Sequence, residues 1–211
     1  LAAFRNQGQV CLAGSRIIAH KSVVDRVTER VVAYAQRLKM GDPLDEATTL
    51  GSLVSQDHRD KVASYAKIAA DEATIVCGGN VPQEGALGQG AYFEPTVVTG
   101  VSQSSRLVQE EIFGPLVTIQ SFDDEEEAMA MLNGTRYGLS CSLWTQDIHR
   151  AQWASSQAKT GLVWVNTWFQ RNLEAAFGGM KDSGVGREGG QWSLDFFSDW
   201  KTISTYVPPA P

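Results

Sequence analysis

The stretch LVTIQSFDDEEEAMAMLNGTRYGLSCSLW, residues 116–144, decides the fold class. Residues 116–122 are rich in β-branched and aromatic side chains and predict a strand. Residues 124–133, which open on acidic side chains, predict a helix, and residues 139–144 predict the next strand. Strand–helix–strand alternation is typical of an α/β domain with a largely parallel sheet. We therefore expect a mostly parallel sheet flanked by helices.

The same alternation extends to both sides of this stretch. Further strands are predicted at residues 15–20, 73–77, 93–98 and 162–165. Further helices are predicted at residues 22–38, 56–72, 148–157 and 191–198. We expect Ser22 to cap the first of these helices and the glycine-containing residues 80–91 to form a loop. Residues 202–207, TISTYV, predict a last strand outside the alternation, which would pair with another domain or another subunit.

The composition is that of an ordinary globular protein. Of the 211 residues, 43% are hydrophobic and 20% are charged, which argues against disordered and collagen-like classes. The formal net charge is −6 and no basic block occurs, which argues against nucleic acid as a partner. No apolar run approaches the length of a membrane span, and the first residues carry no secretory signal. We therefore expect neither membrane insertion nor secretion.

The cysteines and histidines argue against a disulfide framework and against a metal site. The three cysteines, Cys11, Cys77 and Cys141, are odd in number and widely spaced, with no CxxC pair. The three histidines are scattered, with no HExxH pattern, and no GxSxG word anchors a serine hydrolase. We expect a reducing, cytoplasmic setting and no bound metal.

The first segment that could carry chemistry is FRNQGQVC, residues 4–11. Its Cys11 could act as a nucleophile, because a thiolate attacks carbonyl carbons once local groups favour its ionised form. Asn6, Gln7 and Gln9 would supply polar groups, and Gly8 would allow close backbone approach. The alternative is that Cys11 is a small buried apolar residue.

Two further segments stand out. EEIFGP, residues 110–115, places a carboxylate pair beside an aromatic residue, a combination that could accept ribose hydroxyls and pack on a flat heterocycle. The alternative is a solvated acid pair before a strand. FGGMKDSGVGRE, residues 177–188, is dense in glycine but lacks the phosphate-binding GxxxxGK[ST] pattern, so we interpret it as a tight functional loop.

In this order, the three segments resemble the aldehyde dehydrogenase superfamily, and the resemblance runs from residue 4 to about residue 205. It implies that Cys11 is the nucleophile and that its backbone N–H helps to hold the oxyanion. It also implies that Glu111 binds the nicotinamide-side ribose, that Phe113 lies beside the nicotinamide, and that Phe177 lines the substrate tunnel. The implied cofactor is NAD, with NADP left open.

The resemblance also implies a domain organisation. Residues 1–198 correspond to the catalytic domain and residues 199–211 to a C-terminal oligomerisation arm. The family's dinucleotide-binding domain, its oxyanion asparagine and the glutamate that activates water would all precede Leu1. The chain by itself is therefore not expected to oxidise an aldehyde. A homodimer or homotetramer is expected for the full-length enzyme.

A fourth segment refines the expected substrate. NTWFQRNLEAAFGG, residues 166–179, resembles the branch that acts on 2-hydroxymuconate or 2-aminomuconate semialdehyde. Arg171 would bind a substrate carboxylate, because a guanidinium matches a carboxylate bidentately; the alternative is a surface arginine that caps a loop. Phe4 and Trp168 would be apolar walls of the tunnel, with core packing as their alternative.

Two other functions stay open at this level. The chain could be a truncated, non-catalytic homologue that assembles through residues 202–207, or a thiol esterase that uses Cys11 without a cofactor.

Overall fold

The computed structural model describes residues 1–210. Its centre is a four-stranded sheet in the order β1-β4-β3-β2. These strands are β1 (Arg16–His20), β2 (Thr74–Cys77), β3 (Thr96–Thr99) and β4 (Leu116–Phe122). Strand β4 pairs in parallel with β1 and with β3, whereas β2 is an antiparallel edge strand. The prediction of a mostly parallel sheet flanked by helices is confirmed.

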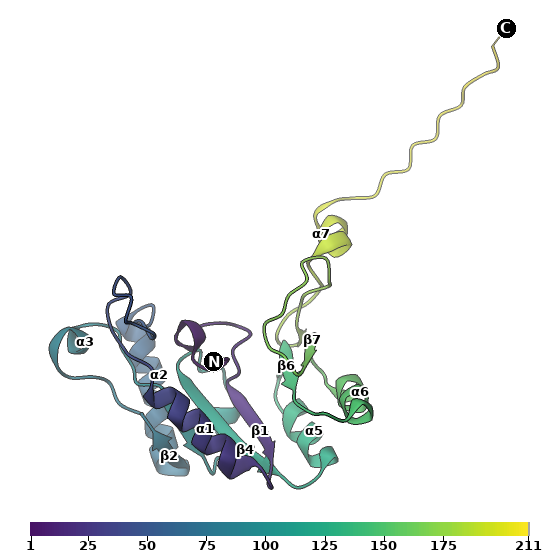
Figure 1. Ribbon diagram of the computed structural model, residues 1–211. Coiled ribbons are helices and arrows are strands. Elements are labelled where there is room, and N and C mark those ends of the chain that lie inside the picture. The colour runs from purple at the N-terminus through teal and green to yellow at the C-terminus, as the bar shows by residue number, and fades with distance from the viewer. Residues whose placement is uncertain (211) are drawn as a thin grey trace.

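Two helices cover the two faces of this sheet (Figure 1). Helix α1 (Val24–Gln36) packs on the face that carries Val97 and Val117, and helix α2 (Gln56–Glu72) packs on the face that carries Val98 and Leu116. Successive side chains of a strand point to opposite faces of the sheet. The apolar run in β4 therefore contributes side chains to the hydrophobic cores on both faces. Strand β4 is accordingly buried along most of its length.

The alternation continues beside the main sheet (Figure 1). Helix α5 (Glu125–Asn133) leads through β5 (Tyr137–Gly138) to β6 (Ser140–Leu143). Helix α6 (Ile148–Gln157) then crosses over to β7 (Leu162–Val165), which pairs in parallel with β6. Strand β5 pairs with β8 (Met180–Lys181), which belongs to the glycine-dense segment.

Side chains from distant segments bind the carbonyl groups at the C-terminal end of α5. Arg16 donates to the carbonyls of Met131 and Leu132 at 3.2 and 3.1 Å. Lys181 donates to those of Asn133 and Thr135 at 2.9 and 2.7 Å. The last carbonyls of a helix have no partner within the helix and attract cations. These contacts tie β1 and the glycine-dense segment to one helix end.

Three of the differences from the predicted local structure concern helices. Ser22 does not cap α1: Val23 precedes the helix without a side-chain cap, and the Ser22 hydroxyl lies 2.7 Å from His20 Nδ1. The expected loop at residues 80–91 contains the short helix α3 (Gly85–Gln89). Helix α4 (Arg106–Gln109), capped by Ser105, was not predicted. Helices of four or five residues are too short to show a helical period.

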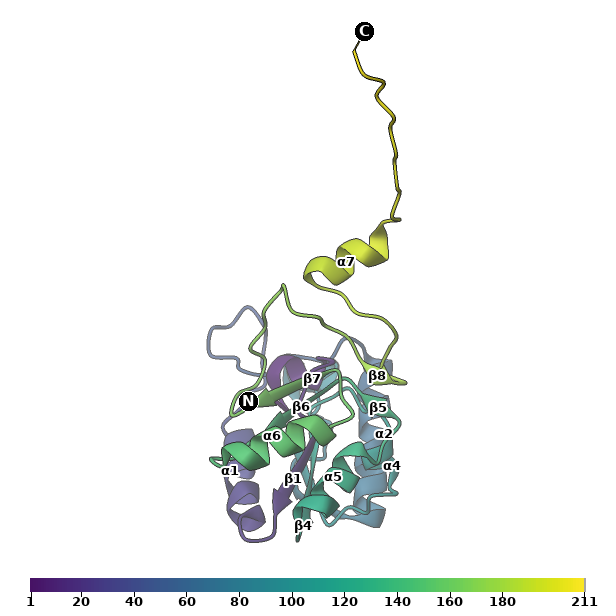
Figure 2. The same ribbon diagram turned by 90° about the vertical axis from the view of Figure 1, so that its right-hand side faces the viewer.

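The C-terminal residues leave the body of the molecule. Helix α7 (Gly190–Phe197) is followed by an extended tail that projects away from the other elements (Figure 2). Residues 199–210 are exposed and form no strand. The strand predicted at residues 202–207 is therefore not formed within this chain, because a strand needs a partner for its hydrogen bonds.

Within residues 1–210, no helix has the length and apolar character needed to cross a bilayer. In the same residues, no group of three or more His, Cys, Asp and Glu side chains is placed to hold a metal ion.

Candidate active site

The segment before Cys11 has an unusual backbone. The 3₁₀ turn η1 (Arg5–Gly8) contains Asn6, Gln7 and Gly8 with φ angles of 48°, 56° and 71°. A side-chain-bearing residue adopts this left-handed region at a cost, so the surrounding structure must hold the segment in place. A Cβ atom on Gly8 would lie 2.1 Å from the carbonyl oxygen of Gly114. The first and second sequence segments therefore touch each other through two glycines.

Cys11 lies on a turn that follows this segment. The turn is closed by a 2.8 Å hydrogen bond from Ala13 N–H to the Val10 carbonyl. Cys11 is exposed, whereas Leu12 is only 3% exposed. The buried Leu12 side chain therefore anchors the turn, and the Cys11 side chain is accessible to solvent. In this chain Cys11 is therefore not the buried apolar residue of the alternative interpretation.

The other two cysteines have different surroundings. Cys77 in β2 and Cys141 in β6 are half-buried, and burial raises the pKa of both thiols. A raised pKa lowers the thiolate fraction at neutral pH. Cys11 is thus the cysteine best exposed to a reactant.

The amides around Cys11 hold the loop instead of facing the sulfur. The Asn6 amide donates to the Gln9 carbonyl at 3.0 Å. Gln9 Oε1 accepts from the Val54 N–H at 3.0 Å, and the Gln7 amide oxygen can accept from the Gly51 N–H at 2.9 Å. The contacts of these three amides therefore serve the structure of the loop. The backbone N–H of Cys11 donates to no acceptor among residues 1–210.

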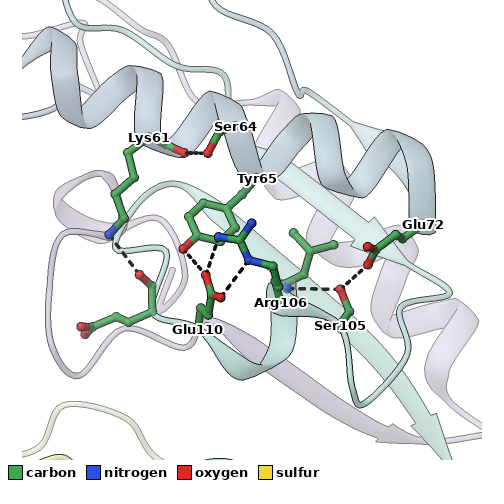
Figure 3. A network of polar contacts seen from close by, with 9 residues as sticks. Lys61, Ser64, Tyr65, Glu72, Ser105, Arg106 and Glu110 are labelled. Carbon is green, nitrogen blue, oxygen red and sulfur yellow. Dashed lines mark hydrogen bonds and ion pairs between the residues drawn. The ribbon is translucent and has the colours of Figure 1, made fainter.

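The two acids of the second segment have separate surroundings. Glu110 accepts from the Tyr65 hydroxyl at 2.8 Å and from the Arg106 guanidinium at 2.8 and 2.9 Å (Figure 3). These hydrogen bonds, with that of Arg106 the strongest, lower the pKa of Glu110 to about 2. The Glu110 carboxylate is thus bound by side chains of α2 and α4.

The neighbouring Glu111 has a free carboxylate. Its side chain is exposed and forms no hydrogen bond or ion pair with residues 1–210, while its backbone carbonyl accepts from Lys61 Nζ at 3.2 Å. Ile112 is buried in the core, and His58 Nε2 lies 2.7 Å from the carbonyl oxygen of Phe113. Phe113 has a φ of 58°. Helix α2 therefore holds the backbone on both sides of Ile112 and leaves the Glu111 carboxylate available.

The third segment closes into a tight loop. Phe177 and Glu188 exchange two backbone hydrogen bonds of 2.8 Å. The Arg171 guanidinium carbon lies 4.4 Å from the centre of the Phe177 ring, a cation–π geometry. Both residues line a hollow of about 270 Å³, together with residues that include Trp164 and Asn172. Arg171 itself is exposed. The structure thus brings together two of the residues expected to bind substrate.

Trp168 and Phe4, the other two expected wall residues, lie in different places. The Trp168 indole N–H donates to the carbonyl of Leu12 at 2.8 Å, next to Cys11. Phe4 is 3% exposed and its ring lies 6.4 Å from that of Tyr34 in the core beneath α1. Phe4 therefore packs in the hydrophobic core, which is the alternative interpretation of this residue.

Three residues of this site have no signal in the sequence: His58, Lys61 and Tyr65. Each acts on a segment far along the chain, and their helical positions on α2 alone give no indication of these partners. Arg106 is different, because it lies at the i,i+4 spacing from Glu110 that is typical of a local ion pair.

Known proteins are similar to this chain in sequence. The aldehyde dehydrogenase family model matches residues 1–203. The chain is 46% identical over 204 residues to the 2-hydroxymuconic semialdehyde dehydrogenase of Pseudomonas putida. It is 44% identical over 208 residues to a 2-aminomuconic 6-semialdehyde dehydrogenase of a Pseudomonas species. These matches cover 96% and 98% of this chain but 42% of each relative.

Solved structures share the fold. PnpE from Pseudomonas sp. WBC-3 superposes with a TM-score of 0.90 at 40% identity, covering 99% of this chain and 44% of that one. Betaine aldehyde dehydrogenase from Staphylococcus aureus, solved in complex with NAD+, gives 0.89 at 39% identity, covering 93% and 39%. The chain thus spans less than half of the length of these relatives. Over nearly all of its own length, this chain belongs to the aldehyde dehydrogenase family.

Proposed function

We propose that this chain carries the nucleophile and the substrate-facing and ribose-facing residues of an NAD(P)-dependent aldehyde dehydrogenase. The observation that carries this is the exposure of Cys11 on a turn held from both sides. On one side Gly8 packs on Gly114, next to Phe113, and on the other Trp168 binds the residue after Cys11.

The chemistry at Cys11 has two halves. The Sγ thiolate forms a bond to the aldehyde carbon, and the carbonyl π electrons move to oxygen, giving a thiohemiacetal oxyanion. The unpaired Cys11 N–H is suited to hold that oxyanion. Loss of hydride from carbon converts the adduct to a thioester, and hydrolysis by water then breaks the carbon–sulfur bond and releases the carboxylic acid and the Cys11 thiol. Bound NAD(P)+ supplies the acceptor for that hydride.

The residues present fit the nicotinamide-side half of such a cofactor. The free Glu111 carboxylate has two acceptor oxygens for the two hydroxyls of a ribose. Phe113, held through its carbonyl by His58, supplies an aromatic ring two positions after Glu111. The S. aureus relative was solved with NAD+, which supports NAD as the cofactor here.

The substrate class follows from Arg171 and Phe177. A guanidinium beside a hollow of about 270 Å³ suits a small aldehyde that already bears a carboxylate. The two semialdehyde dehydrogenases among the relatives support 2-hydroxymuconate or 2-aminomuconate semialdehyde. We assign residues 1–198 to the catalytic domain and the following residues to an oligomerisation arm of a homodimer or homotetramer.

The deciding experiment replaces the sulfur. In the intact protein that contains this chain, Cys11→Ser should lower dehydrogenase turnover by roughly 10³-fold or more while the circular dichroism spectrum stays unchanged. Cys77→Ser, which removes a half-buried thiol from β2, serves as the matched control and should retain activity. Mass spectrometry after incubation with aldehyde and NAD+ should find the acyl adduct on Cys11. Retained turnover in Cys11→Ser would overturn the proposal.

A second candidate is a non-catalytic assembly module. It is favoured by the exposed apolar side chains of the tail, among them Trp200 and Ile203, which are 87% and 79% exposed. Light scattering of the isolated chain tests it: a monomer without partner uptake would remove this candidate.

A further inference from the structure

Residues 166–171, which we name the strap, connect β7 to the glycine-dense segment and are fixed at several points. The Asn166 side chain exchanges hydrogen bonds of 2.9 and 2.8 Å with the backbone of Thr145. The Ser142 hydroxyl donates to the carbonyl of residue 167. The Trp164 indole donates to the Gln170 carbonyl at 2.8 Å. These hydrogen bonds hold the strap both at its first residues and near its last residues. They thereby fix the strap to β6 and β7.

The strap also holds the segment around Cys11. The Trp168 indole N–H binds the Leu12 carbonyl at 2.8 Å, across 156 positions of sequence. The Arg5 guanidinium carbon lies 5.3 Å from the centre of the Phe169 ring, so a second contact reaches the start of the same segment. Phe169 has a φ of 63°, a conformation that marks a constrained backbone.

The Leu12 carbonyl is a sensitive place for such an anchor. Cys11 and Leu12 are the two central residues of the turn closed by Ala13 and Val10. The Leu12 side chain is buried, so the indole bond supplies the second fixed point of that residue. The Leu12 carbonyl and the Ala13 N–H belong to one peptide group, which is held by Trp168 at its oxygen and by the Val10 carbonyl at its N–H. The Val10 carbonyl shares its peptide plane with the Cys11 N–H, so these contacts restrain the direction of that N–H and of the Cys11 Cα–Cβ bond.

We propose that Trp168 is a positioning residue for the nucleophile, and not primarily a wall of the substrate tunnel. Its indole N–H fixes the Cys11–Leu12 turn so that the thiolate and the Cys11 N–H converge on one carbonyl group. This rests on the proposed role of Cys11 as nucleophile. A small misplacement of a reacting group lowers the rate strongly, because catalysis depends on a narrow range of attack geometries. The strap ends at Arg171, so nucleophile and carboxylate-binding residue are fixed to one short segment.

The test removes only the hydrogen-bond donor. In the intact protein, Trp168 is replaced by β-(3-benzothienyl)alanine, in which sulfur stands for the indole N–H at nearly unchanged ring volume. We expect kcat to fall about tenfold for charged and neutral aldehydes alike, with KM within about twofold. Hydrogen exchange of the amides in residues 9–14 of the cofactor-free protein should become faster. The same replacement at Trp153, half-buried in α6, is the control and should change neither.

Other outcomes would contradict this role. Unchanged kcat together with unchanged exchange in residues 9–14 would overturn it. A raised KM for aldehydes without a change in exchange would assign Trp168 to the tunnel wall instead. The Cys11→Ser experiment is independent: its failure would remove the proposed function, whereas the exchange measurement still reports whether Trp168 holds the turn.

Discussion

Gly8 lies against Gly114 so closely that a Cβ on Gly8 would stand 2.1 Å from the Gly114 carbonyl oxygen and 2.5 Å from its carbon. Gly8 also has a φ of 71°, which glycine adopts without strain. This contact holds the Cys11 segment against the residues proposed to face the cofactor. Position 8 thus requires both the absence of a Cβ atom and a left-handed backbone, and mutations can measure the cost of each requirement separately.

Gly8→Ala should both destabilise the protein and lower its turnover. The left-handed backbone costs about 1–2 kcal/mol, and the clash adds to this, for a total of at least about 3 kcal/mol. Urea unfolding and turnover measure the two effects. Gly85→Ala is the matched control, because Gly85 has a φ of 58° but open space around its Cβ position. Equal losses in the two variants would show that the contact with Gly114 is not needed.

Glu110→Gln should remove an acid-dependent part of the stability. The folded-state pKa of Glu110, about 2, lies below the ordinary 4.5, so its contribution is present above pH 4.5 and is lost as pH falls towards 2. The Arg106 and Glu110 side chains are 61% and 40% exposed, so solvent screening limits this contribution to about 1 kcal/mol or less. Urea unfolding across this range should show the two proteins converge at low pH.

Glu111→Gln should give the converse result. It retains the Glu110 contacts with Tyr65 and Arg106, so its stability profile with pH should follow the unmodified protein. It loses one carboxylate acceptor for a ribose diol, so NAD+ binding should weaken by about tenfold, in line with one charge-assisted hydrogen bond. Calorimetric titration of the intact protein with NAD+ measures this. Unchanged affinity would remove Glu111 from the cofactor site.

Arg171→Ala should discriminate between substrates. For a semialdehyde with a carboxylate, kcat/KM should fall by an amount equivalent to about 1.5–3 kcal/mol, the range of charge-assisted hydrogen bonds. A neutral aldehyde of similar size should lose much less, because it has no group for the guanidinium to bind. Arg171→Lys keeps the charge but loses the bidentate fork, and we expect an intermediate value. Equal losses for both aldehydes would contradict the carboxylate-binding role.

The double variant Trp200→Ser, Ile203→Ser should lower the assembly state. Both side chains lie on the exposed tail, and apolar surface of this extent is a common feature of subunit contacts. Light scattering of the intact protein that contains this chain should give a lower molar mass for the double variant than for the unmodified protein. The control is Leu44→Ser with Val54→Ser, because these side chains are 92% and 81% exposed but lie on the body of the chain. If both double variants keep the mass of the unmodified protein, the arm does not mediate assembly.

Much of the fold was predictable from local patterns. The bounds of α2, β4, α6 and β7 agree with the predicted ranges, because apolar periodicity and nearby turn residues are properties of neighbouring positions. The one-turn helices α3 and α4 were missed because they hold no full period. The strand predicted at residues 202–207 is not formed, because residues 1–210 offer it no hydrogen-bonding partner and pairing is not a property of one strand alone.

The sequence by itself determined the α/β alternation. Through three ordered segments it also indicated the family, and with it Cys11 as the candidate nucleophile and Glu111 as the candidate ribose-binding residue. Only the tertiary structure placed Tyr65 on Glu110 and left the Glu111 carboxylate without a partner among residues 1–210. It also decided that Phe4 is core and that Trp168 binds beside Cys11. The physical reason is distance along the chain. Hydrogen bonds that join groups 45 or 156 positions apart leave no period and no local composition for a sequence pattern to record.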